Sequence, residues 1–220
     1  MQPSRPVPVP PAARRTSRLP RGARRLQLLR AAQDVFVAQG FHAAAMDDIA
    51  DRAGVSKPVL YQHFPGKREL YLALLEQQVD ELTDRVREAL AGTEDNRLRV
   101  DGVVGAYFGF IDAEGEAFRL VFESDLRNDL EVRRVVDRGA QVCIDAVAGV
   151  IADDTGVDRE RALLLASGLI GSAESSARWW LAGKGTLSRE EAASLMSRLS
   201  WRGISGFPRR DSEDAEVSDA

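Results

Sequence analysis

The stretch that decides the fold is IADRAGVSKPVLYQHFPGKRELYLALL, at positions 49–75. Gly54 follows a short run with helical spacing, where the left-handed residue that ends a helix is expected. Ser56 is placed to cap a new helix by accepting hydrogen bonds from the free amides of its first turn. Phe64 precedes Pro65, which disfavours helical geometry, so the new helix ends after about two turns. The stretch therefore predicts two short helices joined by a tight turn.

The second of these helices has one apolar side and one largely polar side. Leu60 and Phe64 are four residues apart and can be buried together, and Val55 is placed to contact Leu60 as a hydrophobic staple. Pro58 is tolerated because a first-turn N–H has no intrahelical acceptor. The outer side carries Lys57, Pro58, Val59, Tyr61 and Gln62. This pattern predicts a helix-turn-helix whose second helix fits the major groove of DNA, with an ordinary helical corner as the alternative.

The remaining chain also has helical periodicity. A helix at about 21–39 ends at Gly40, a second covers about 46–53, and a long one covers about 67–90. Further helices are expected at about 97–112, 115–127, 129–153, 158–182 and 188–203. No alternating strand pattern and no hairpin signal is present. We therefore expect an all-α protein of about nine helices, with a three-helix N-terminal domain and a larger helical body.

Charge is divided unevenly along the 220 residues, whose formal net charge is -4. Residues 1–71 carry 12 Lys or Arg against 5 Asp or Glu, and residues 72–220 carry 18 against 29. The first 20 residues hold six of the nine prolines and no apolar segment, which is typical of a disordered arm. A basic end on an acidic chain indicates a polyanionic partner at that end, unless the charges only form a solvated face.

Several classes of protein are excluded by composition. Cys143 is the single cysteine, so no internal disulfide can form, and with only His42 and His63 beside it a zinc site is not expected. No apolar run approaches the roughly 20 residues of a membrane-spanning helix. No phosphate loop, nucleophile elbow or His/Cys cluster supports the rival hypothesis of an enzyme with an added helix-turn-helix. We expect a cytoplasmic protein that is not an enzyme and has no metal, cofactor or membrane partner.

The same residues resemble the DNA-binding region of the TetR family of bacterial transcriptional repressors over about residues 24–75. The matching positions are Phe36, Gly40, Phe41, Asp48-Ile49-Ala50, Ala53-Gly54-Val55-Ser56, Leu60-Tyr61, His63-Phe64, Lys67 and Leu70. The resemblance implies a helix-turn-helix domain at 21–66 and an effector-binding and dimerisation domain at 67–204. Composition predicts the flanking segments, a basic arm at 1–20 and an acidic tail, expected to be disordered, at 205–220.

The resemblance also implies the DNA contacts. Lys57, Pro58 and Val59 would lie near base edges, within a recognition face that also includes Ser56 and Gln62. Tyr61, His63 and Lys67 match positions that meet backbone phosphates, although Tyr61 could pack against the first helix and His63 could be satisfied within the fold. Lys67 is also expected at a helix N-terminus, which favours an anion, although it could simply be solvated. Arg24 and Arg25 end an arginine-rich segment that we expect to reach the DNA backbone or minor groove.

One departure concerns the start of the second helix. The family commonly has threonines there, one of which caps the helix and touches phosphate, whereas this chain has Ala43-Ala44-Ala45. Alanine can do neither, so we expect a weaker cap that costs about 1 kcal/mol.

The body offers candidates for a ligand site and for a dimer interface. Aromatic and polar residues that could line an effector pocket are Tyr107, Phe108, Phe122, Glu174, Arg178 and Trp179, with plain core packing as the alternative for the aromatic residues. The 163–182 segment is apolar nearly all round and rich in small residues, so we expect it to pack against its copy together with the last helix. The interface would contain Ala166, Leu169, Ala173, Leu195, Met196 and Leu199, and an intrachain core helix is the alternative.

Together these observations predict a homodimeric repressor of transcription. It would bind a palindromic operator in double-stranded DNA and be released from it by a small-molecule effector. The alternative is a helix-turn-helix DNA-binding protein that has no small-molecule effector and is controlled by a protein partner.

Overall fold

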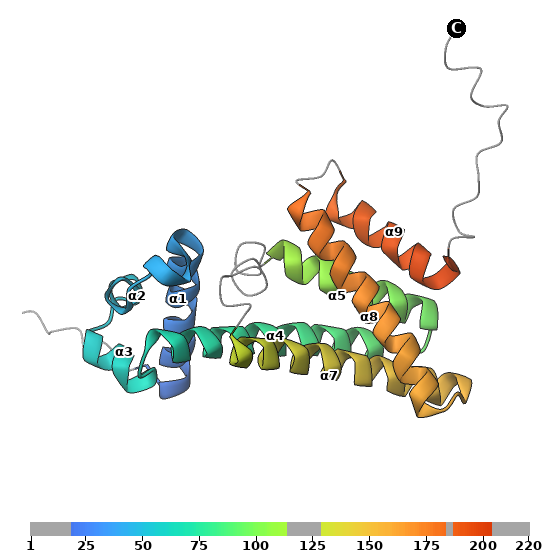
Figure 1. Cartoon of the computed structure of the whole chain (residues 1–220), viewed down its shortest axis with the longest axis horizontal. Coiled ribbons are helices and arrows are strands. Elements are labelled where there is room, and N and C mark those ends of the chain that lie inside the picture. Colours follow the sequence, from blue (N-terminus) through green and yellow to red (C-terminus); the bar gives the residue numbers. More distant parts are fainter. Residues whose placement is uncertain (1–18, 114–128, 184–186, 204–220) are drawn as a thin grey trace, which may run out of the picture.

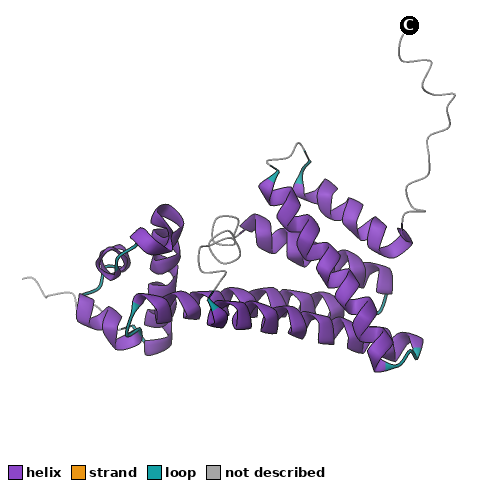
Figure 2. Ribbon diagram, viewed as in Figure 1, coloured by secondary structure: helices purple, strands orange, loops and turns teal. Residues whose placement is uncertain are grey.

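The computed structural model describes residues 19–113, 129–183 and 187–203, and within these ranges every regular element is a helix (Figure 2). The helices are α1 (Arg21–Ala43), α2 (Met46–Ala53), α3 (Lys57–His63), α4 (Lys67–Ala91), α5 (Asn96–Ala113), α7 (Leu130–Thr155), α8 (Arg159–Ala182) and α9 (Arg189–Arg202). The all-α class is confirmed. The expected helix at 115–127, the tail at 205–220 and all but two residues of the arm at 1–20 lie outside the described residues.

Two glycines set the turns of the N-terminal domain. Gly40 has φ 76° and ψ 164°, which interrupts α1 at the predicted position, and residues 41–43 form one more turn beyond it. Gly54 ends α2 at φ 64° and ψ 36°, and its N–H donates to the carbonyls of Ala50 and Asp51. A residue with a Cβ would be strained at either position. These two breaks allow α1, α2 and α3 to fold back on one another.

The core of this domain includes the first turns of α4. Phe36, Leu60 and Leu70 are fully buried, and the ring of Tyr71 packs edge-on against Phe36 and Phe41 at centroid distances of 5.5 and 5.1 Å. The side chain of Gln27 crosses from α1 to donate a 2.8 Å hydrogen bond to the carbonyl of Ala53 at the end of α2. Helix α4 is therefore anchored in the helix-turn-helix domain before it leaves it.

Helix α4 connects this domain to the body (Figure 1). It runs beside α7 in the same direction, so that the start of α4 lies at the start of α7 and Val79 faces Gly139. A Cβ on Gly139 would lie 2.3 Å from Val79 Cγ1, so the close approach of the two helices depends on this glycine. Helices α5, α8 and α9 cover the other end of the pair (Figure 1). No described helix is long and apolar enough to cross a membrane.

Helix α8 has one side in the intrachain core and one side exposed. Ala166 and Ala173 are fully buried within the protomer, so the expectation that they contact a second chain is wrong for both. The intrachain alternative holds for them because this side of α8 packs against α5 and α7. The opposite side leaves large apolar side chains uncovered: Leu164 is 73% exposed and Trp179 is 72% exposed.

Candidate nucleic-acid interface and ligand cavity

The short helix α3 presents the predicted outer face. Leu60 is fully buried and Phe64 is 2% exposed, which confirms that these two residues hold the helix on the domain core. Ser56, Lys57, Pro58, Tyr61 and Gln62 are exposed, whereas Val59 and His63 are half-buried. Tyr61 keeps 48% of its surface, so it is not packed away against α1. A protruding helix with a mixed polar face is the shape that the major groove accepts.

Ser56 occupies the N-cap position of α3 but does not cap it through its side chain. Its backbone is extended, at φ -73° and ψ 149°, and its hydroxyl makes no capping hydrogen bond. An N-cap side chain accepts from the second or third helical N–H. Pro58 has no N–H, and the N–H of Val59 donates to the Ser56 carbonyl at 2.9 Å. The expected hydroxyl cap is therefore wrong, because neither usual donor is available.

Lys57, the first residue of α3, is paired with a carboxylate of α2. Its Nζ lies 2.5 Å from Oδ2 of Asp47, and both side chains remain more than half exposed. The hydrogen bond and charge of Asp47 raise the pKa of the Lys57 ammonium. Lys57 is therefore held at the start of the recognition face. Sequence reasoning missed Asp47. Its place in the first turn of α2 could be predicted from the sequence, but its pairing with Lys57, ten residues away, could not.

The other end of α3 lies among arginines of α1. Burial lowers the pKa of His63, and the charges of Arg21, Arg25 and Arg24 lower it further. The guanidinium of Arg25 lies 4.6 Å from the centroid of the Phe64 ring, a cation–π distance. Arg24 and Arg25 thus lie near α3, and their contact with DNA stays a prediction. A neutral His63 among cations leaves this end positively charged, which suits a phosphate.

Lys67 is used inside the domain. Its Nζ donates to the carbonyls of Phe41 at 2.7 Å, His42 at 3.1 Å and Ala44 at 2.8 Å, and it lies 4.7 Å from the centroid of the Phe41 ring. An ammonium has three N–H donors, so these bonds use all of them. Lys67 therefore ties the turn after Gly40 to the start of α4. A phosphate contact by Lys67 stays a prediction and would require one of these bonds to be exchanged.

The start of α2 has no side-chain cap. Ala45 is at its N-cap position and makes no side-chain hydrogen bond, which agrees with the weak cap expected from the three alanines. Asp47 and Asp48 lie in the first turn instead. Carboxylates near a helix N-terminus interact favourably with the helix dipole, so they stabilise the end that lacks a cap.

Arg68 links the helix-turn-helix domain to the body. Its Nη2 is 3.0 Å from both carboxylate oxygens of Asp129, and its Nη1 is 2.5 Å from Oε2 of Glu131. Asp129 is also the N-cap of α7, where it accepts from the N–H groups of Glu131 and Val132. The first turn of α4 and the start of α7 therefore share one charged cluster.

The body contains a cavity of about 300 Å³ at the end away from the helix-turn-helix domain. It lies between α4, α5, α7, α8 and α9, and Leu90 and Trp201 contribute from the ends of α4 and α9. Most of the lining is aliphatic and comprises Val100, Val103, Val104, Val147, Val150, Ile151 and Leu169. A cavity of this size and character suits an apolar group of a small molecule.

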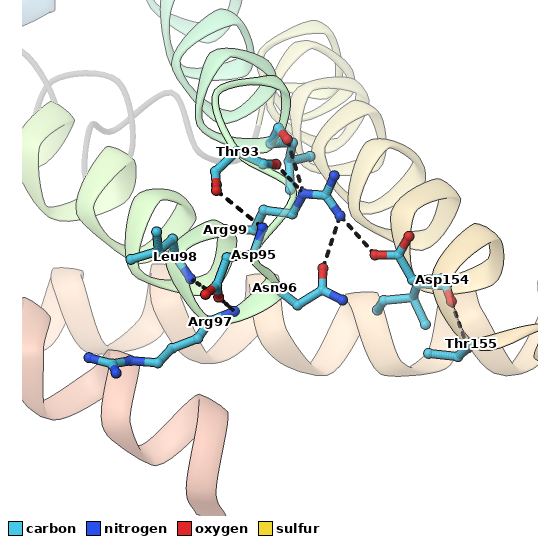
Figure 3. Close-up of polar contacts among 10 residues, drawn as sticks. Thr93, Asp95, Asn96, Arg97, Leu98, Arg99, Asp154 and Thr155 are labelled. Atoms are coloured by element: carbon cyan, nitrogen blue, oxygen red, sulfur yellow. Dashed lines mark hydrogen bonds and ion pairs between the residues drawn. The ribbon is translucent and has the colours of Figure 1, made fainter.

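The polar end of the cavity is organised around Arg99 (Figure 3). Its Nη1 donates to Oδ2 of Asp154 at 2.7 Å and to Oδ1 of Asn96 at 3.0 Å. Its Nε donates to the carbonyls of Thr93 at 2.8 Å and Leu90 at 3.2 Å. The guanidinium thus joins the α4–α5 turn to the last turn of α7. A ligand that reached this end would meet the Arg99 guanidinium, which is held by four acceptors, one of them the Asp154 carboxylate.

The residues expected to line a pocket are elsewhere. Tyr107 and Phe108 are core residues, 2% and 1% exposed, and burial raises the pKa of Tyr107, whose hydroxyl is hydrogen-bonded with Cys143. Tyr107 and Glu174 border only a void of about 20 Å³, and Glu174 pairs with Arg178 at 2.5 Å. Trp179 is exposed on α8, and Phe122 lies outside the described residues.

None of the five described residues of that expected set lines the 300 Å³ cavity. The set followed aromatic residues, whereas the cavity is mostly aliphatic, so their role in binding a ligand stays a prediction that this cavity does not support. The spacing of Val100, Val103 and Val104 was the available signal, but buried core helices show the same spacing.

Comparison with known proteins agrees with this architecture. Residues 28–74 match the family described as "Bacterial regulatory proteins, tetR family", and residues 96–203 match a family described as "Tetracyclin repressor-like, C-terminal domain". The first match covers the core of the helix-turn-helix domain, and the second covers α5, α7, α8 and α9, which line the cavity together with the end of α4.

Individual relatives extend the likeness over most of the chain. It is 47% identical over 195 residues to the HTH-type transcriptional activator FasR of Mycolicibacterium smegmatis, covering 89% of each chain. It is 34% identical over 108 residues, 49% of this chain and 52% of the relative, to the HTH-type transcriptional repressor KstR2 of Rhodococcus jostii.

Solved structures show the same fold. A TetR-like transcriptional regulator from Rhodococcus sp. RHA1 is 29% identical with a TM-score of 0.64, covering 86% of this chain and all of that one. The regulator FadR from Bacillus subtilis, solved in complex with stearoyl-CoA, is 18% identical with a TM-score of 0.68, covering 81% and 98%. The chain therefore belongs to the TetR family of bacterial regulatory proteins and is a helix-turn-helix regulator of transcription rather than an enzyme.

Proposed function

We propose that this protein works as a homodimer that binds a palindromic operator and whose affinity for DNA is set by a ligand in the 300 Å³ cavity. The observation that carries the proposal is that α4 begins in the core of the helix-turn-helix domain and ends, at Leu90, in the lining of the cavity. Its 25 residues correspond to about 37 Å of helix. A change in the cavity therefore has a rigid element through which to reach the DNA-binding surface.

The dimer would form on the exposed side of α8. Leu164, Leu165 and Trp179 are uncovered there, and Gly168 and Gly171 lie between them on the same side. Glycines allow a second helix to approach closely, and exposed large apolar side chains gain free energy when covered. A twofold dimer would offer two α3 helices to half-sites one DNA turn apart, about 34–36 Å. Leu195, Met196 and Leu199 of α9 are half-buried and would complete the interface.

The ligand would carry an apolar chain. The aliphatic lining of the cavity supports this, and the structurally similar FadR is bound to stearoyl-CoA. At the polar end the charges of Arg99 and Asp154 largely cancel, so this end would favour a polar group of the ligand without a strong preference for its sign. An acyl thioester whose charged part stays outside the cavity meets both requirements.

Regulation would follow from two spacings of the α3 helices. A ligand shifts DNA affinity only by the difference between its affinities for the DNA-competent and DNA-incompetent conformations. Repression stays a prediction, since one relative is named an activator and the other a repressor. A helix-turn-helix protein controlled by a protein partner is the second candidate, and the exposed apolar side of α8 is a surface that a partner could cover.

The test is selection of bound fragments from genomic DNA by the full chain, followed by affinity measurements with and without stearoyl-CoA. We expect a palindrome bound by two chains, and an affinity that changes at least about tenfold with the ligand, within the usual range of coupling. Fragments without twofold symmetry would refute the dimer. A palindrome whose affinity ignores stearoyl-CoA and other acyl-CoA chain lengths would favour control by a protein partner.

A further inference from the structure

The two ends of α3 have different electrostatic surroundings. At its C-terminal end, Arg25 lies over Phe64, and Arg21, Arg24 and Arg25 are close enough to lower the pKa of His63. None of the three pairs with a carboxylate among the described residues. At its N-terminal end, the ammonium of Lys57 is paired with Asp47. The positive charge at one end is therefore open to phosphates, whereas at the other end it is largely neutralised.

A carboxylate is unexpected on a surface that only has to hold DNA. Phosphate contacts supply affinity for every sequence, and an acidic side chain beside them reduces it. Yet α2 places Asp47 against Lys57, and Asp51 is close enough to raise the pKa of that ammonium further. Asp47 also stabilises the uncapped start of α2 through the helix dipole, but that role does not require its bond to Lys57, so the bond serves something else.

We propose that Asp47 is a specificity-determining residue, which positions Lys57 for a base edge in the major groove and keeps its ammonium away from phosphates. Free lysine is a point charge on a flexible stem of four carbons, so it binds whichever acceptor is nearest. The bond to Asp47 uses one of its three N–H donors and restricts the ammonium to one place. Two donors remain, which matches the O6 and N7 acceptors that guanine presents side by side.

The inference rests on the proposed DNA binding, and the chain offers a matched control for it. Asp34 and Arg52 form a second ion pair of the same domain, with a distance of 2.6 Å and side chains 51% and 60% exposed. The Asp47 and Lys57 side chains are 53% and 60% exposed. The control pair joins α1 to the last turn of α2, whereas Asp47 lies in the first turn. Exposed pairs add little to folding stability, and Asp47→Asn gives up in addition only one favourable interaction with the α2 dipole, so both Asp-to-Asn variants should fold.

The experiment measures Kd for the selected operator and for a random duplex of equal length, over a range of salt concentrations, with full-length protein. For Asp47→Asn we expect binding to random DNA to strengthen and the ratio of the two affinities to fall about tenfold, within the range of one base contact. The salt dependence on random DNA should become steeper by up to about 0.9, the value of one added phosphate contact. Asp47→Glu should restore most of the discrimination, and Asp34→Asn should leave it unchanged.

Combination with Lys57→Gln separates positioning from direct contact. Lys57→Gln alone should lose the same discrimination, and adding Asp47→Asn to it should change nothing more, because no ammonium is left to position. An effect of Asp47→Asn that persists without Lys57 would overturn the proposal, since Asp47 would then act on DNA itself. An Asp47→Asn ratio within twofold of wild type, or an equal loss in Asp34→Asn, would also overturn it. Wild-type protein that does not discriminate at all would instead refute the proposed function, and this inference with it.

Discussion

Replacement of Gly139 by alanine tests the packing that joins α4 to the body. A Cβ at this position would lie 2.3 Å from Val79 Cγ1, where about 3.5–4.0 Å is the ordinary carbon–carbon separation. Val79 is 6% exposed and β-branched, so its preferred helical rotamer leaves it little freedom to turn away. The two helices must therefore separate, or Val79 must adopt a strained conformation.

The magnitude follows from two opposing effects. Overpacking a core costs about 1–3 kcal/mol, and a shortfall of more than 1 Å belongs in the upper part of that range. Alanine is about 1 kcal/mol better than glycine inside a helix. We therefore expect Gly139→Ala to lower the free energy of unfolding by about 1–2 kcal/mol, which corresponds to roughly 3–6 °C in Tm for a chain of this size.

Gly149→Ala on the same helix is the control, because nothing lies within 4 Å of its added Cβ. This variant gains the helix propensity without the clash, so it should be more stable than wild type by up to about 1 kcal/mol. Denaturant unfolding followed by circular dichroism, at one fixed protein concentration, measures both. Adding Val79→Ala to Gly139→Ala should recover part of the loss. A Gly139→Ala protein as stable as Gly149→Ala would refute the close α4–α7 contact.

Three further predictions concern a cap, the cavity and pH. Ser188→Ala should lower the free energy of unfolding by about 1 kcal/mol because it breaks a full capping box. Ser56→Ala should change the free energy of unfolding little, because the Ser56 hydroxyl makes no capping bond. Chemical denaturation compares the two variants. Val150→Phe should fill the cavity and abolish the response of operator affinity to stearoyl-CoA, while operator affinity without stearoyl-CoA stays unchanged. An unaltered response in a folded variant would place the ligand elsewhere. Hydrogen bonds from Arg68 and from the α7 backbone lower the pKa of Asp129 in the folded protein. Its contribution to stability is therefore present above the unfolded value of 3.8 and is lost as pH falls through the folded value. Arg68→Gln should flatten this acid-side loss in unfolding measured between about pH 2 and 4, and an unchanged slope would show that the ion pair does not matter.

Much of the helix-turn-helix domain could be predicted from sequence because its determinants are local. Whether a residue tolerates positive φ, and whether a proline ends a helix, depends only on that residue and its near neighbours in the chain. Gly54 has the left-handed φ expected of it, Gly40 breaks α1 where a helix end is expected, and Leu60 and Phe64 are buried as their spacing indicates. Apart from α3, seven predicted helices fall in the described residues, and each begins within one residue of its predicted position.

The errors in the body have a different cause. Whether Ala166 faces its own protomer or a second one depends on how α8 packs on α5 and α7, and a helix with small residues on several sides gives no preference. Two of the aromatic residues expected in a pocket, Tyr107 and Phe108, are core residues, because burial area rewards an aromatic ring equally in either place.

The amino-acid sequence by itself determined the helical class, the position of the turn between α2 and α3, and the residues on the outer face of α3. Only the tertiary structure decided that Lys67 binds three carbonyls, that Lys57 is held by Asp47 and that the cavity is lined by valines from α5 and α7. The physical reason is distance along the chain. A helix cap or a turn depends on residues within about four positions, whereas the partner of a charged side chain and the walls of a cavity come from segments that meet only after the chain has folded.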